Sequence, residues 1–144
     1  LHGKMLSPSE MLEVLAGACL KSGGEHFLLE GFPRAVDQVD AVEEALAPVS
    51  FVVRIESDAI TPEARAVGEH FAEENGRVFT IDGSLAEGEV AAALEKICIG
   101  QRAGRALPEG TVLGLLLGEA NDGIREAAES AGFAAINFEE VLEA

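Results

Sequence analysis

An arginine and a glutamine stand four residues apart just after a short apolar run. The run 27–29 (Phe-Leu-Leu) ends at the turn 30–33 (Glu-Gly-Phe-Pro), and Arg34 and Gln38 come next. Arginine is suited to binding phosphate because its planar fork can donate two parallel hydrogen bonds to phosphate oxygens. The pattern therefore indicates a phosphate-binding turn at the end of a strand. The alternative is a buried strand that ends at a proline turn, with a solvated arginine.

A second candidate is the glycine-bounded run 118–125. A working phosphate loop has a glycine, four residues, a second glycine, a lysine and a hydroxyl residue; its backbone N–H groups and lysine hold phosphate and its hydroxyl holds magnesium. Gly118 and Gly123 match the two glycines, but Ile124 stands at the lysine position and Arg125 at the hydroxyl position. The run is therefore a degenerate phosphate loop or simply a strand-to-helix turn.

Two carboxylates add to the mismatch in this run. Glu119 and Asp122 lie where a phosphate would bind. A like-charge contact at about 4 Å costs on the order of 4 kcal/mol at an effective dielectric constant of about 20, which is roughly a thousandfold in affinity. We expect Arg125 to compensate only in part, because it projects from a different helical position.

The segment 27–34 with Gln38 closely resembles the nucleoside-monophosphate-binding strand and turn of adenylate kinases. The resemblance implies that Arg34 clamps the phosphate of AMP, that Gln38 reads the adenine edge and that Gly31 belongs to the same nucleotide site, with Glu30 in place of the usual aspartate. Residues 71–78 and 81–84, which include Gly83, are similar to the last helix, the last strand and the turn beside the adenine of ATP. If the site works, its ligands are AMP and ATP with magnesium.

Strands alternate with helices along the chain, which predicts an α/β fold with a doubly wound, five-stranded parallel sheet. The expected strands are 27–32, 51–55, 77–81, 112–117 and 134–138. Helices are expected from a capping box at Ser7 to about residue 22, and over 35–46, 62–75, 84–99, 123–131 and 139–144, with a second capping box at Ser84. Residues 100–110 are typical of a connector.

The order of the parts differs from that of the family. Residues 1–100 resemble the second part of an adenylate kinase and residues 111–144 the first, phosphate-loop part. The chain is therefore either a piece of a tandem array or a circular permutant, and we expect one domain over 1–144. The resemblance implies that the phosphate-loop strand is central in the sheet, between the strand at 27–32 and the next one; without 112–117 that place would be empty and two backbone edges exposed. The predicted strand order is 134–138, 27–32, 112–117, 51–55, 77–81.

Composition narrows the class of partner. The chain has 144 residues and a net charge of −16, which disfavours nucleic acids and anionic membranes. No apolar run approaches the length of a membrane span. Cys19 and Cys98 lie in apolar helical patterns and are expected to be reduced core thiols of an intracellular protein. The three histidines, His2, His26 and His70, have no metal-ligand spacing, so we expect no metal site.

Kinases of this family carry arginines in a lid, whereas here residues 56–60 join a strand directly to a helix. Since phosphoryl transfer is mainly positioning and charge stabilisation, this loss and Ile124 together predict a non-catalytic domain without a cofactor. It would serve as a scaffold or docking module for protein partners or neighbouring domains of a longer chain. The alternatives are a nucleoside-monophosphate kinase and an AMP-binding sensor. Multi-copy chains of this kind resemble those of cilia and flagella, so the analogy implies a cytoplasmic, axonemal location.

Overall fold

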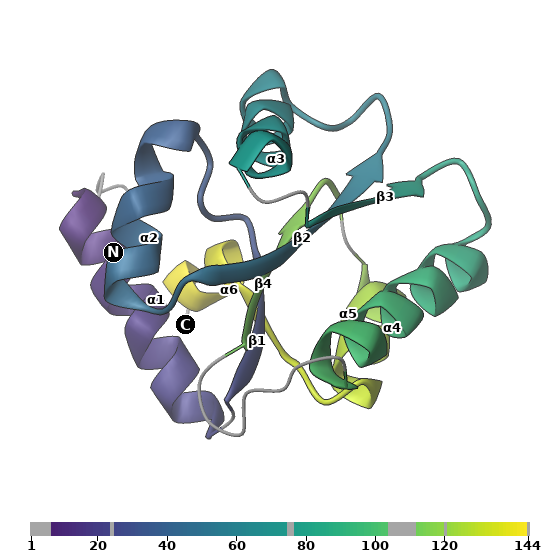
Figure 1. Ribbon diagram of the computed structural model, residues 1–144. Coiled ribbons are helices and arrows are strands. Elements are labelled where there is room, and N and C mark those ends of the chain that lie inside the picture. Colours follow the sequence, from purple (N-terminus) through teal and green to yellow (C-terminus); the bar gives the residue numbers. More distant parts are fainter. Residues whose placement is uncertain (1–6, 24, 75–76, 104–111, 120, 144) are drawn as a thin grey trace.

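Five parallel strands form one sheet in the order β3-β2-β4-β1-β5 in the computed structural model (Figure 1), which describes residues 7–23, 25–74, 77–103, 112–119 and 121–143. The strands are β1 (His26–Glu30), β2 (Val49–Glu56), β3 (Val78–Asp82), β4 (Val112–Leu117) and β5 (Ala134–Asn137). The predicted doubly wound α/β class and strand order are confirmed.

Strand β4 occupies the centre because all six of its residues are buried. It pairs in parallel with β1 on one side, where Leu28 is opposite Gly114, and with β2 on the other, where Val52 is opposite Leu115. An uninterrupted apolar strand needs covered faces on both sides, which only an inner position with helices above and below provides.

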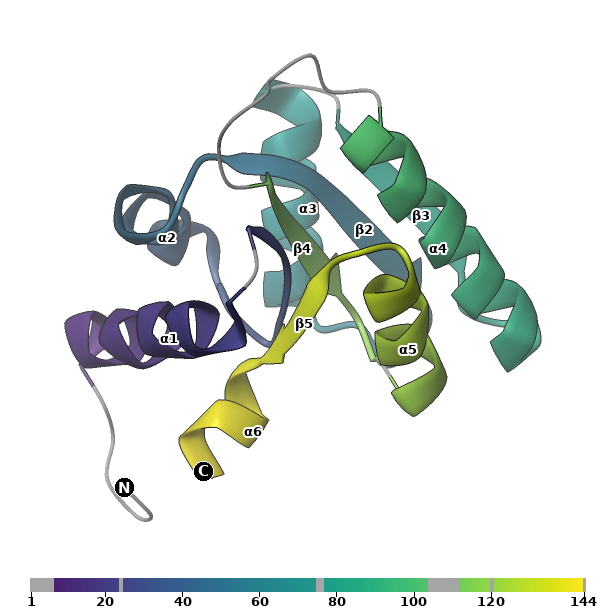
Figure 2. The ribbon, with the colours of Figure 1, turned by 90° about the horizontal axis from the view of Figure 1, so that it is seen from below.

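The helices form two layers. They are α1 (Pro8–Ser22), α2 (Val39–Ala45) with the short 3₁₀ helix η1 (Val36–Gln38) before it, α3 (Pro62–Glu74), α4 (Glu87–Ala103), α5 (Asp122–Ser130) and α6 (Phe138–Glu143). Figures 1 and 2 show α4 and α5 on one face of the sheet and α1, α2 and α3 on the other. Each layer has its own apolar core: Phe71 and Leu113 lie in the core under α1, α2 and α3, and Leu94 and Phe51 lie in the core under α4 and α5.

The ends of the helices follow local chemistry. The Ser7 hydroxyl accepts from the Glu10 amide at 3.2 Å, while the Glu10 carboxylate accepts from the Ser7 amide at 3.1 Å. This is the predicted capping box, and the hydrogen bond that the Ser7 amide donates to the carboxylate is the main cause of the lowered pKa of Glu10. Gly23 ends α1 with a φ of 71°.

The capping box predicted at Ser84 is wrong. The Ser84 hydroxyl and amide both donate to the Asp82 carboxylate, at 2.7 and 2.9 Å, which lowers the pKa of Asp82. The serine is held in a turn and α4 begins only at Glu87. The helix then runs past the predicted end at 99 to Ala103, so the expected connector is helical at its start; its residues 104–110 lie outside the described part of the chain. The helix predicted over 35–46 is divided into η1 and α2.

Cys19 and Cys98 are buried and not joined by a disulfide, as expected. Burial raises the pKa of both thiols, that of Cys98 to about 12. In the part of the chain that the structure describes, no helix is both long and apolar enough to cross a membrane.

Candidate functional site

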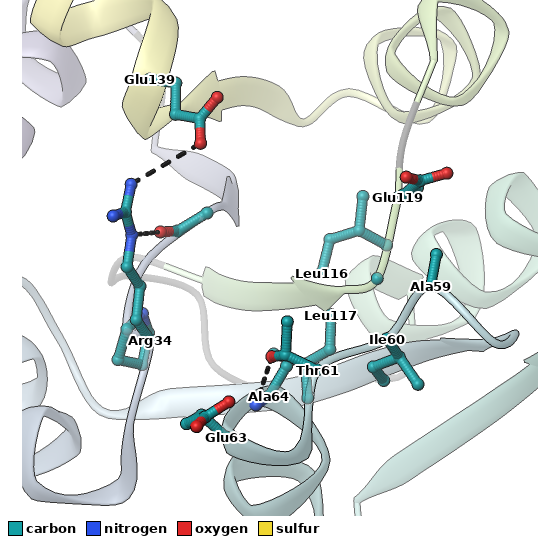
Figure 3. A pocket seen from close by; sticks show the side chains of 13 residues that line it. Arg34, Ala59, Ile60, Thr61, Glu63, Ala64, Leu116, Leu117, Glu119 and Glu139 are labelled. Atoms are coloured by element: carbon teal, nitrogen blue, oxygen red, sulfur yellow. Dashed lines mark hydrogen bonds and ion pairs between the residues drawn. The ribbon is translucent and has the colours of Figure 1, made fainter.

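A cavity of about 450 Å³ opens at the carboxyl ends of the central strands (Figure 3). The chain leaves β1 and β2 toward α2 and α3 on one face of the sheet, and it leaves β4, which lies between them, toward α5 on the other face. Such a reversal separates the loops after neighbouring strands and leaves a crevice, which is the usual ligand site of doubly wound sheets. The lining residues are Gly31, Pro33, Arg34, Ala59, Ile60, Thr61, Glu63, Ala64, Leu116, Leu117, Gly118, Glu119 and Glu139.

Arg34 forms one wall of this cavity and is held by its own turn. Its Nε donates to the carbonyl oxygen of Gly31 at 3.1 Å, and its guanidinium lies over the Phe138 ring, 5.2 Å from the centroid. Gly31 has a φ of 88°, a conformation that glycine adopts without strain. The arginine pairs with Glu139 at 3.7 Å rather than with the neighbouring Asp37, and its side chain stays 52% exposed.

Gln38 serves the same turn and does not line the cavity. Its side-chain oxygen Oε1 accepts a hydrogen bond from the Arg34 amide at 2.8 Å. This contact stabilises the turn before η1 and uses the oxygen that a nucleobase amino group would need. The structure thus brings the predicted pair together, but as a turn and its cap.

The turn between β4 and α5 is fixed by close packing at Gly118 and by the helix cap at Asn121. Gly118 has a φ of 109°, and a side-chain Cβ there would lie 2.7 Å from the Ile55 carbonyl oxygen, so this glycine is needed for close strand packing. Asn121 caps α5 by accepting from the Ile124 amide at 3.0 Å. Ile124 is 2% exposed and packs in the core between the sheet and the α4–α5 layer. The position expected for lysine is therefore part of the core.

Arg125 is the centre of a charged cluster that sequence reasoning did not find. Its guanidinium lies 3.1 Å from Glu30, 3.1 Å from Glu140 and 3.2 Å from Asp122. The Asn137 side chain also donates to Glu30. The hydrogen bond to Glu30 is the main cause of the raised pKa of Arg125. Glu30, which stands in place of the aspartate of the resembled family, is thus paired with a cation of the protein itself.

The remaining predicted glycines lie away from the cavity lining. Gly123 is in the first turn of α5. Gly83 follows β3, and its amide donates to the Glu56 carbonyl oxygen at 2.8 Å; a Cβ there would lie 2.7 Å from that oxygen. Gly31 and Gly118 are therefore the two predicted glycines that border the cavity, together with Arg34.

The arginines near β2 also form ion pairs within the protein. Arg54 lies 3.2 Å from Glu56 and donates to the Thr80 hydroxyl at 3.3 Å, and Arg65 of α3 pairs with the same glutamate. Within the described ranges no group of three or more metal-ligating side chains comes together. His26 packs edge-on against Phe133 with centroids 5.6 Å apart, and His2 lies outside the described residues.

The charges around the cavity are mostly negative. Glu63, Glu119 and Glu139 reach it from α3, the β4–α5 turn and α6, against the single cation of the lining residues, Arg34. The Thr61 hydroxyl caps the start of α3 by accepting a hydrogen bond from the Ala64 amide at 3.1 Å. An anion entering here would meet one arginine, itself paired, and three carboxylates.

No protein-family model, curated protein or solved structure gives a significant match to this chain. The class that fold and site define is a doubly wound α/β domain with an acidic, apolar-floored crevice at the carboxyl edge of its sheet.

Proposed function

We propose that this chain is a degenerate adenylate-kinase-like domain that does not transfer phosphate and acts as a docking module within a larger protein. The observation that carries the proposal is the burial and pairing of the two residues after Gly123. Ile124 is buried in the core, and Arg125 is bound by the protein's own carboxylates. Neither can neutralise a transferring phosphoryl group, a reaction that depends almost wholly on positioned positive charge.

The connection between β2 and α3 supports the same proposal. It spans residues 57–61 and contains no arginine, and Arg65, the first arginine beyond it, pairs with Glu56. A kinase of the resembled family would place lid arginines between these elements. Among the described residues, Arg34 is the one cation that lines the crevice, and it already pairs with Glu139.

A coupled assay with millimolar ATP, AMP and magnesium tests the loss of catalysis. We expect no turnover by the purified chain. Because a trace of host kinase would give a false signal, the Arg34→Ala variant is purified and assayed in parallel. Turnover of roughly 1–100 per second that disappears in the variant would refute the proposal.

Binding of AMP without turnover is the second candidate, favoured by the exposure of Arg34 on the cavity wall and its long 3.7 Å pairing with Glu139. A charge-assisted contact contributes about 1.5–3 kcal/mol, so Arg34→Ala should weaken AMP binding more than tenfold. Titration calorimetry at low salt, with ATP as the weaker comparison ligand, checks this. Absence of heat with AMP would leave the docking function.

A further inference from the structure

We propose that the cavity is the docking pocket itself and that its occupant is a basic segment of a partner protein, with an arginine side chain entering between Glu63 and Glu119. This inference rests on the proposed docking function and names its surface and its partner. The argument begins with the floor of the cavity. Ile60, Leu116 and Leu117 lie there with 7%, 3% and 5% of their surface exposed.

The size of the cavity suits a side chain with an apolar stem. Its volume of about 450 Å³ lies within the range of pockets that bind small ligands, about 300–1,000 Å³. The stem of an arginine or lysine side chain can cover apolar surface while the charged end reaches polar groups. A partner's arginine, with an aliphatic neighbour, can therefore cover the floor and place its guanidinium at the rim.

The rim supplies the complementary charge. Arg34 already contacts Glu139, whereas the side chains of Glu63 and Glu119 form no ion pair or hydrogen bond within the described residues. Figure 3 shows these two carboxylates at separate sides of the cavity, with Leu116 and Leu117 between them. An arginine is favoured over a lysine because its fork can bind a carboxylate through two parallel hydrogen bonds.

The whole molecule favours the same partner. A net charge of −16 attracts a basic segment from a distance and repels phosphate. The specific part of the binding must nevertheless come from the rim. Local and global attraction can be separated by variants that change the net charge equally at different places.

The test uses a fluorescently labelled peptide, acetyl-Ala-Leu-Arg-Leu-Ala-amide, in an anisotropy titration at low and moderate salt. We expect the double variant Glu63→Gln/Glu119→Gln to bind the peptide at least tenfold more weakly than the parent chain. The matched control is Glu73→Gln/Glu129→Gln, which has the same net charge but changes two exposed carboxylates outside the cavity lining. The control should bind as the parent does, and a peptide with glutamine in place of arginine should bind at least tenfold more weakly.

Three outcomes would overturn the docking pocket. The first is an equal loss of peptide affinity in the two double variants, which would mean general charge attraction. The second is equal affinity for the arginine and glutamine peptides. The third is no binding of the arginine peptide at millimolar concentration. The phosphotransfer assay is independent of these results, so a failure of the pocket and a failure of the non-catalytic proposal are distinguishable.

Discussion

At the scale of single residues, Arg125 has a structural role. It follows the buried Ile124 at the start of α5 and joins three elements, because Glu30 belongs to β1 and Glu140 to α6. Glu30 has only 12% of its side chain exposed, and both the Arg125 guanidinium and the Asn137 side chain contact it. The cluster holds α6 near the cavity, where Phe138 and Glu139 contact Arg34.

Removing this arginine should destabilise the fold. Loss of one partner of a buried ion pair costs about 3–5 kcal/mol because the other charge stays uncompensated. Arg125 is a quarter exposed, so we expect Arg125→Ala to lower the free energy of unfolding by about 2 kcal/mol, measured by urea unfolding. The added change Glu30→Gln should restore part of the loss.

The control for this prediction is Arg34→Ala, because Arg34 is 52% exposed and pairs at 3.7 Å. Exposed pairs contribute about 0–1 kcal/mol, so this variant should be nearly as stable as the parent chain. Equal losses in the two variants would mean that the Arg125 cluster does not stabilise the fold.

At the scale of elements, the central strand depends on a glycine that leaves room for a ring. A Cβ at Gly114 of β4 would lie 2.5 Å from the Phe51 ring atom Cζ and 3.0 Å from Leu28 Cδ1. Phe51 is 1% exposed and belongs to the core beneath α4 and α5. The pairing of β2 with β4 therefore requires a residue without a side chain at this position.

We expect Gly114→Ala to lower the free energy of unfolding by about 1–3 kcal/mol, the usual cost of overpacking a core. The matched control is Gly17→Ala in α1, where a Cβ meets no atom within 4 Å and helix propensity should raise stability by about 0.5–1 kcal/mol. Thermal or urea unfolding measures both. Gly114→Ala with unchanged stability would contradict the close packing, and Phe51→Leu should rescue the alanine variant in part.

At the scale of the molecule, one sheet joins segments from both ends of the chain. Strand β4 pairs with β1 and β2, and β5, near the carboxyl end, pairs with β1 at the edge. Helix layers cover both faces (Figure 2). The inner strand should therefore open only when the whole sheet unfolds, whereas an edge strand can open locally.

Hydrogen exchange with mass spectrometry tests this arrangement. We expect amides of residues 113–117 to exchange at least tenfold more slowly than those of residues 134–137, because β4 has strands on both sides and β5 on one. Chain concentration should not change the rates if β4 completes its own sheet. Equal rates for the two strands would contradict the central position of β4.

The fold class and the inner position of β4 could be predicted because they depend on repeated, local signals, whereas the full strand order was predicted from the resemblance to adenylate kinases. The continuous apolar run at 112–117 requires an inner position, and strands alternating with helices require parallel pairing. The predicted capping box at Ser84 was wrong because this side chain has two possible local hydrogen-bond partners. Ser84 could cap a helix or bind Asp82, and the sequence does not rank these hydrogen bonds.

The amino-acid sequence by itself determined the fold class, the inner position of the strand at 112–117, the cap of α1 and the absence of lysine after Gly123, because each follows from neighbouring residues or from burial along one element. Tertiary structure alone decided which charges meet. Glu30 and Arg125 are 95 residues apart in the chain, and Arg34 contacts Glu139 of the last helix. The energy of such pairs depends on distances across the sheet edge, which arise only when strands from both ends of the chain lie side by side.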